Sequence, residues 1–237
     1  MVIHLAGDST CASYPVSRAP LTGWGQVLST YCKEDVKVIN RAVSGASSRS
    51  FIAKKHWDKL LRAVHKGDWV IIQFGHNDHS RSHDRFADAA VAFPANLRKF
   101  IADVRAKGAC PIIATSIVKC IYKNGRIAPD YLADYRNAAI AVAQAEKVPV
   151  IDLNKITRDR FNALGEKEAF KFYLGLKPAP APVKGNAVKA AAGRKSSKPR
   201  APQIDRIHLN RQGALEVAKW FVEDCKAQKL PIMECFK

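Results

Sequence analysis

Three residues whose types together support nucleophilic hydrolysis lie near the two ends of this chain of 237 residues. Ser9 follows a short apolar run at the N-terminus, whereas Asp205 and His208 lie close to the C-terminus. A serine hydroxyl is a weak nucleophile at neutral pH, so it needs a base within hydrogen-bond reach and a third group that orients the base. Ser9, His208 and Asp205 can fill these three roles, and they predict a serine hydrolase.

The spacing of the two C-terminal residues favours a compact arrangement. Because two residues separate Asp205 from His208, both can sit on one turn just before the last predicted helix. Hydrolases that place their serine on a nucleophile elbow carry a Gly-x-Ser-x-Gly motif. The chain has no such motif, so we expect a different type of serine hydrolase.

Four separated blocks of sequence support this prediction by their order along the chain. They are Gly7-Asp8-Ser9-Thr10, Asn40-Arg41-Ala42-Val43-Ser44-Gly45, Phe74-Gly75-His76-Asn77-Asp78 and Asp205-Arg206-Ile207-His208. Each block is weak alone, but in this order they resemble the SGNH (GDSL-type) hydrolases. Residues 21–26 and 47–51 are similar to the rhamnogalacturonan acetylesterase branch of that family. The resemblance spans nearly the whole chain except residues 177–203.

The resemblance implies a role for each residue of the site. Ser9 is the expected nucleophile, His208 the base, and Asp205 the residue that orients the imidazole. The backbone N–H groups of Ser9 and Gly45 and the side-chain amide of Asn77 are the expected oxyanion hole. Glycine suits such a position because a residue without Cβ lets the backbone approach a ligand closely. The resemblance implies neither a metal ion nor a cofactor.

The elements that must position these residues follow from the hydrophobic pattern. Apolar runs at residues 2–6, 36–39, 69–74, 110–115 and 148–151 predict five buried parallel strands. Helical patterns lie between them at residues 24–31, 57–64, 94–106 and 131–145, and a last helix follows Asn210. The alternation predicts one domain over residues 1–237, a flavodoxin-like three-layer α/β/α sandwich with a five-stranded parallel sheet. Ligands bind such sheets at the carboxyl ends of the strands, which Ser9, Gly45 and Asn77 each follow.

Residues 177–203 differ from the rest of the chain in composition. They hold seven basic residues, no acidic residue and five of the twelve prolines, so their removal would lower the formal charge from +18 to +11. Such a segment buries too little apolar surface to offset its ordering entropy, so we expect a flexible basic insertion. A basic surface attracts nucleic acid, anionic lipid and uronic-acid polysaccharide alike, and the simplest alternative is a solvated spacer.

Neither a membrane span nor a leader is apparent. No run of about 18 apolar residues occurs, and Met1 leads directly into the first predicted strand without a signal peptide. Family members that attack pectin are commonly exported, so the resemblance favours a secreted or periplasmic protein.

The six cysteines do not form the dense pattern of a disulfide scaffold. Cys110 lies in a predicted strand, where we expect a small core residue. Cys225 and Cys235 flank the end of the last helix and are the candidate pair under oxidising conditions. Cys11 is the only cysteine near the serine motif, and its place two residues after Ser9 favours a neighbour of the nucleophile over a second nucleophile.

A cluster of metal-binding residue types also needs an interpretation. It comprises His76, Asp78, His79, His83 and Asp84. These residues mix a strand end with a polar loop and lack a recognised ligand spacing, so we predict no metal site.

Together these observations predict a metal-independent carbohydrate O-acetylesterase, with acetylated rhamnogalacturonan the substrate suggested by the resemblance. The expected partner is an acetylated acidic polysaccharide or oligosaccharide, with no obligate nucleic acid. One alternative is an esterase or lysophospholipase on another acyl substrate, because the same residues serve many esters. Another is a non-catalytic module that binds polyanions. The sequence specifies neither the oligomeric state nor the position of the acetyl group.

The basic segment leads to a first prediction. It ends at residue 203, directly before Asp205 and His208, so its positive charges are tethered beside the expected active site. Replacing residues 177–203 with a short neutral linker should raise the Michaelis constant for an acidic polysaccharide and weaken its salt dependence, because screened long-range attraction is lost. Hydrolysis of an uncharged aryl acetate is the control and should not change. Equal kinetics on the acidic polymer with and without the segment would favour the spacer.

Overall fold

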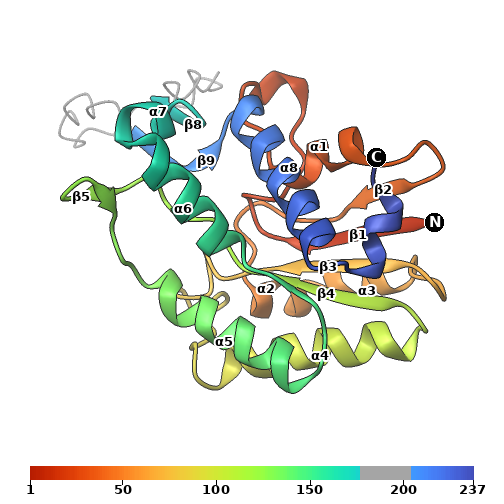
Figure 1. The fold of residues 1–237 in the computed structure, drawn as a ribbon. Coiled ribbons are helices and arrows are strands. Elements are labelled where there is room, and N and C mark those ends of the chain that lie inside the picture. The colour runs from red at the N-terminus through yellow and green to blue at the C-terminus, as the bar shows by residue number, and fades with distance from the viewer. Residues whose placement is uncertain (177–203) are drawn as a thin grey trace, which may run out of the picture.

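A parallel sheet forms the centre of the protein (Figure 1). The computed structural model describes residues 1–176 and 204–237, and the expected basic insertion at residues 177–203 lies outside them. The sheet has five strands in the order β2-β1-β3-β4-β7, and every neighbouring pair is parallel. The strands are β1 (Val2–Gly7), β2 (Lys37–Asn40), β3 (Trp69–Gln73), β4 (Cys110–Ala114) and β7 (Val150–Ile151). The predicted five-stranded parallel sheet is therefore confirmed.

Helices cover both faces of this sheet (Figure 1). One face packs against α1 (Trp24–Val27), α6 (Leu153–Leu164) and α8 (Arg211–Ala227), and the short α7 (Glu166–Phe170) follows α6. The other face packs against α2 (Ser48–Ala53), α3 (His56–Leu61), α4 (Ala92–Ala106) and α5 (Leu132–Ala145). The three-layer α/β/α arrangement expected from the alternation of strands and helices is thus observed.

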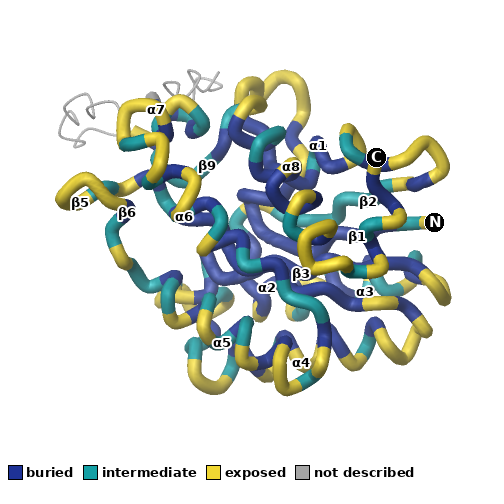
Figure 2. The backbone as a smooth tube through the Cα atoms, in the orientation of Figure 1, coloured by how far each residue is buried: buried dark blue, intermediate teal, exposed yellow. Residues whose placement is uncertain are grey.

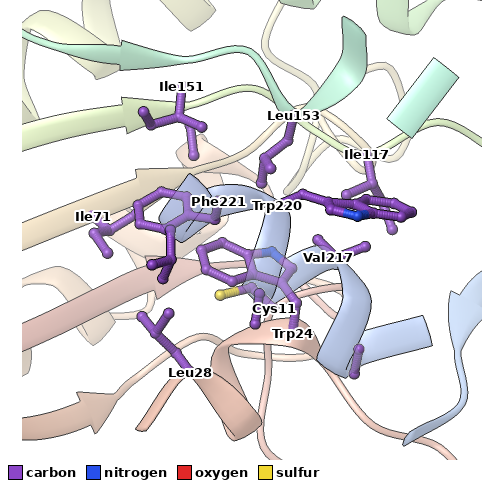
Figure 3. Close-up of a cluster of buried hydrophobic side chains, with 14 of the residues drawn as sticks. Cys11, Trp24, Leu28, Ile71, Ile117, Ile151, Leu153, Val217, Trp220 and Phe221 are labelled. Carbon is purple, nitrogen blue, oxygen red and sulfur yellow. The ribbon is translucent and has the colours of Figure 1, made fainter. Parts of the chain in front are cut away.

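The two hydrophobic clusters follow from the alternation of side chains along the strands. On β3, Val70 and Ile72 join the cluster under α4 and α5, whereas Ile71 joins the cluster under α8. Strand β3 is accordingly buried along its whole length, and β1 is buried from Ile3 onward (Figure 2). In the cluster under α8, Trp24 stacks on Phe221 with ring centroids 5.2 Å apart, and Cys11 lies among these rings (Figure 3).

The structure corrects several expectations about individual elements. The helix predicted at residues 24–31 is α1 followed by a 3-10 turn at Leu28–Tyr31. The helices α2, α6 and α7 were not predicted from the pattern, because each is short or strongly polar. Cys110 lies in a strand as predicted but is exposed, since it is the first residue of β4 and precedes the buried part of that strand.

A larger correction concerns Asp205 and His208, which lie in a strand instead of a turn. They belong to β9 (Ile204–Leu209), which pairs antiparallel with β8 (Tyr173–Leu176). This pairing joins segments on either side of residues 177–203, so it cannot be predicted from the local sequence pattern. A second hairpin joins β5 (Tyr122–Lys123) to β6 (Arg126–Ile127). In the described ranges, no helix combines the length and the apolar character that crossing a membrane requires.

A buried polar network lies where β1 ends. The carboxylate of Asp8 accepts hydrogen bonds from the backbone N–H and the hydroxyl of Thr10, each at 2.8 Å. The amide nitrogen of Gln73 donates to the other oxygen of Asp8 at 3.2 Å. The amide oxygen of Gln73 accepts from the indole N–H of Trp24 at 2.7 Å. Because buried polar groups are costly when unpaired, this network fixes the turn that carries Ser9.

Replacing Gln73 tests how much the fold depends on this network. Gln73→Met keeps the length of the side chain but removes the partners of buried groups on Asp8, Thr10 and Trp24. Since each unsatisfied buried group costs about 1–3 kcal/mol, we expect the free energy of unfolding to fall by about 3 kcal/mol in denaturant titrations. Gln144→Met, on the exposed face of α5, is the matched control and should change it by less than about 0.5 kcal/mol. Equal stability of the two variants would refute a structural role for the network.

Candidate active site

The structure brings Ser9, His208 and Asp205 together. The Nε2 atom of His208 lies 2.9 Å from the Ser9 hydroxyl oxygen. Its Nδ1 atom lies 2.8 Å from the Oδ2 atom of Asp205. The three residues thus form one continuous hydrogen-bonded chain, although 199 positions separate Ser9 from His208.

Local backbone contacts hold Asp205 in place. Its Oδ1 atom accepts from the backbone N–H of Ile207 at 3.0 Å and from that of His208 at 2.9 Å. Burial alone would raise the pKa of Asp205, but the hydrogen bonds from the His208 ring and from these two backbone groups outweigh it and lower the pKa to about 2. Asp205 is therefore a carboxylate at neutral pH, able to orient the imidazole and stabilise its positive charge.

The start of α8 fixes the end of β9. Asn210 caps the helix by accepting from the backbone N–H of Gly213 at 3.0 Å. The amide of Asn210 also donates to the carbonyl oxygens of Lys171 at 2.6 Å and Tyr173 at 3.1 Å. A Cβ at Gly213 would lie only 2.1 Å from the carbonyl oxygen of Phe172, so glycine permits this close approach. These contacts hold the strand that carries Asp205 and His208 against β8.

Ser9 lies two residues beyond the end of β1 and is 7% exposed. The hydroxyl of Tyr14 donates to the carbonyl oxygen of Ser9 at 2.7 Å, which fixes the peptide plane after the serine. Among the described residues, no acceptor is found for the backbone N–H of Ser9. That N–H group is available to a ligand beside the serine hydroxyl.

The residues expected to form the oxyanion hole lie on neighbouring loops. The side-chain amide of Asn77, in the loop after β3, donates to the carbonyl oxygen of Ala46 at 2.9 Å. This bond ties Asn77 to the loop after β2, one residue from Gly45. Gly45 has a positive φ of 77°, and a Cβ there would meet nothing within 4 Å. Its backbone N–H has no acceptor within the part of the chain that the structure describes.

Sequence reasoning missed the structural role of Asp78, which it considered only as the last residue of the third sequence block and as a candidate metal ligand. Asp78 is fully buried and accepts from the backbone N–H of Ser48 at 2.9 Å, from the Ser48 hydroxyl at 2.5 Å and from the backbone N–H of Gly75 at 3.0 Å. Burial has the largest effect on the pKa of Asp78 and raises it to about 7. The hydrogen bonds from Ser48 and Gly75 have the smaller, opposite effect, because they favour the charged carboxylate and lower this pKa. Asp78 therefore connects the loop of Asn77 to the first turn of α2. Ser48 and Asp78 are 30 residues apart in the sequence, so only the fold reveals that they are in contact.

The other residues of that histidine and aspartate cluster do not converge. His79, His83 and Asp84 are exposed, whereas His76 is buried. Over residues 1–176 and 204–237, no group of three or more His, Cys, Asp or Glu side chains has the arrangement of a metal site. The two ring nitrogens of His76 have no hydrogen-bond partner there, and burial lowers its pKa. His76, directly before Asn77 in the chain, is thus a buried neutral imidazole.

The three cysteines considered in the sequence analysis as reactive or paired, Cys11, Cys225 and Cys235, are all buried. Cys11 is fully buried, and burial raises the pKa of its thiol well above the usual range, so this residue is unsuited to nucleophilic attack. Cys225 and Cys235 are buried free thiols in the structure. The sulfur of Cys235 lies 3.1 Å from that of Met1. The structure thus describes both as thiols, and their pairing under oxidising conditions stays a prediction.

Comparisons with known proteins identify the family of this chain and agree with its fold. A model of the GDSL-like lipase/acylhydrolase family matches residues 5–214. The chain is 33% identical over 233 residues to the rhamnogalacturonan acetylesterase RhgT of Bacillus subtilis (strain 168), covering 98% of this chain and 92% of RhgT. It is 30% identical over 236 residues to the probable rhamnogalacturonan acetylesterase YesY of the same organism, covering 98% of this chain and 95% of YesY.

A solved structure extends the comparison to three dimensions. The protein YxiM of Bacillus subtilis superposes with a TM-score of 0.77 and 27% sequence identity, over 97% of this chain and 57% of the YxiM chain. The chain thus spans a little over half of YxiM. The resemblance seen in the four sequence blocks is confirmed: this protein belongs to the GDSL-like lipase/acylhydrolase family and is a carboxylic ester hydrolase.

Proposed function

We propose that this protein is a serine esterase that removes acetyl groups from a carbohydrate, with acetylated rhamnogalacturonan as the substrate. The observation that carries the proposal is the hydrogen-bonded chain from Ser9 through His208 to Asp205. The names of two relatives, RhgT and YesY, support the acetyl group and the polymer.

The first half of the proposed reaction forms an acyl-enzyme. The hydroxyl oxygen of Ser9 attacks the carbonyl carbon of the acetyl ester while Nε2 of His208 takes the hydroxyl proton. The bond between the acetyl carbon and the sugar oxygen then breaks, and His208 gives its proton to that oxygen, which leaves as the alcohol. Asp205, a carboxylate at neutral pH, stabilises the positive imidazole between these steps.

The second half regenerates the enzyme. A water molecule gives a proton to His208 while its oxygen attacks the acetyl carbon on Ser9. The bond between that carbon and the Ser9 oxygen then breaks, His208 returns the proton to the serine oxygen, and acetic acid leaves. Both halves pass through a tetrahedral intermediate whose negative charge lies on one oxygen. The N–H groups of Ser9 and Gly45 have no acceptor among the described residues, and Asn77 is tied beside Gly45. These observations support the three groups as the oxyanion hole.

The other functions receive less support. A lysophospholipase needs an apolar groove for an acyl chain, whereas the lining of the hollow beside the loop after Asn77 includes three charged residues, Arg81, Asp88 and Asp134. A module that only binds polyanions has no need for a base held against a serine by a carboxylate. Both observations favour an esterase with a polar substrate.

A panel of acetylated polysaccharides tests the proposal. We expect the wild-type protein to release acetate from acetylated rhamnogalacturonan and from a generic aryl acetate, with chelator present or absent. Ser9→Ala should abolish release from both while it leaves the thermal unfolding transition nearly unchanged, because this hydroxyl contributes little to the core. Ser29→Ala, on an exposed residue, is the matched control and should keep full activity. Acetate release by a folded Ser9→Ala variant would refute the mechanism.

A further inference from the structure

A cavity of about 590 Å³ lies beside the proposed active site, between the loop after β3 and the start of α5. Its walls include His79, Arg81, Phe86, Asp88, Tyr131 and Asp134. A second hollow of about 610 Å³ shares Asp88 and Asp134 and continues along α5. Ligand sites in proteins commonly have volumes of about 300–1,000 Å³. Each hollow is therefore large enough for a sugar residue.

Direct contacts connect this cavity to the loop of Asn77. His79 follows Asn77 by two residues and stacks on Tyr131 with ring centroids 3.4 Å apart. The Tyr131 hydroxyl donates to the carbonyl oxygen of His76 at 3.2 Å. Burial, followed by the negative charges of Asp130 and Asp8, raises the pKa of Tyr131. A ligand in the cavity therefore lies near the reacting ester.

Aromatic rings form the apolar part of the cavity. His79 is exposed, with one ring face against Tyr131, so its other face is accessible. The side chain of Phe86 is 41% exposed, so part of its ring is accessible from the cavity that it lines. Accessible rings of this kind suit the flat face of C–H groups that a pyranose presents. They provide contact area at a small cost in conformational entropy.

Carboxylates form the polar part. Asp134 is exposed and lines the cavity. Asp88 accepts from the backbone N–H of Val91 at 2.7 Å and from that of Ala92 at 3.3 Å, which orients it at the start of α4. A carboxylate is a pure acceptor and can bind the hydroxyl groups of a sugar, which are donors. The hydroxyl groups of a sugar can thus donate hydrogen bonds to Asp88 and to Asp134.

The charge of the cavity selects the kind of sugar. The residues that line the cavity include two carboxylates, Asp88 and Asp134, and one guanidinium, that of Arg81. Burial, followed by the charge of Lys119, lowers the pKa of His79, which is therefore neutral at neutral pH. Lys119 itself forms an ion pair with Asp130 at 3.1 Å. The walls thus carry a negative excess, which disfavours the carboxylate of a uronic acid although the chain as a whole has a formal charge of +18.

We propose that this cavity binds a neutral sugar residue of the substrate, with its ring against His79 and Phe86 and its hydroxyls on Asp134 and Asp88. The inference rests on the proposed function, because it places this sugar beside the residue that carries the acetyl ester. Uronic acid residues of the same polymer bind outside the cavity.

Two variants and two matched controls test the inference by kinetics. Phe86→Ala removes the exposed ring, and Val91→Ala removes an apolar side chain that is 70% exposed and does not line the cavity. Asp134→Asn removes the acceptor charge, and Glu34→Gln does the same at an exposed site at the opposite end of the strands. The substrates are acetylated xylo-oligosaccharides, which are neutral, acetylated oligogalacturonides, which are acidic, and an aryl acetate.

We expect KM for the acetylated xylo-oligosaccharides to rise about tenfold in Phe86→Ala and in Asp134→Asn, which corresponds to about 1.4 kcal/mol each. The value of kcat and the hydrolysis of the aryl acetate should not change, and both controls should match the wild type. An unchanged KM in both cavity variants would overturn the inference. So would an Asp134→Asn variant whose KM falls for the oligogalacturonides and stays constant for the neutral substrate, since a uronic acid would then occupy the cavity.

A binding measurement separates this inference from the proposed function. Calorimetric titration of the wild type and of Phe86→Ala with deacetylated xylo-oligosaccharides reports on the cavity without any reaction. Binding that is about tenfold weaker in Phe86→Ala supports the cavity even if no ester is hydrolysed. Acetate release by a wild type that does not bind these oligosaccharides would overturn the inference and leave the esterase intact.

Discussion

The position of Ser9 depends on the buried carboxylate of Asp8. This carboxylate binds Thr10 on one side and Gln73 on the other, and Gln73 in turn binds Trp24. Gly7 and Gln73 also face each other in the register of β1 and β3. The turn after β1 is therefore fixed by a neighbouring strand and by a helix of the covering layer, and a serine at this point needs no mobile loop to reach its base.

The second half of the site depends on a different kind of constraint. Asp205 and His208 lie in a hairpin strand outside the central sheet, and the N-terminal cap of α8 holds the end of that strand. The helix packs its apolar face against the sheet, with Phe221 stacked on Trp24. Since Trp24 also binds Gln73, one indole ring contacts both the network below Ser9 and the helix that follows His208. The packing of α8 against the sheet thus fixes where β9 ends, and with it the position of His208.

The sequence was sufficient to predict the sheet and to name Ser9, Asp205 and His208, which the structure brings together, but not to predict the contacts that support them. Strongly apolar runs such as that of β3 predict buried strands because little else can bury them. The strand that carries His208 was predicted as a turn, since its partner lies across residues 177–203 and only long-range pairing defines it. The role of Asp78 also required the fold, because Ser48, its partner, is 30 residues away. The cavity at His79 and Tyr131 combines two loops that no local pattern connects.

The covalent intermediate tests the central claim most directly, namely that Ser9 transfers the acyl group through His208. The wild-type protein is mixed with an aryl acetate, the reaction is stopped with acid within the first turnover, and the protein is digested and analysed by mass spectrometry. The account predicts the added mass of one acetyl group on the peptide that contains Ser9, and no such addition in Ser9→Ala. Rapid acetate release with no modified peptide, or an acetyl group carried by a different residue, would contradict it.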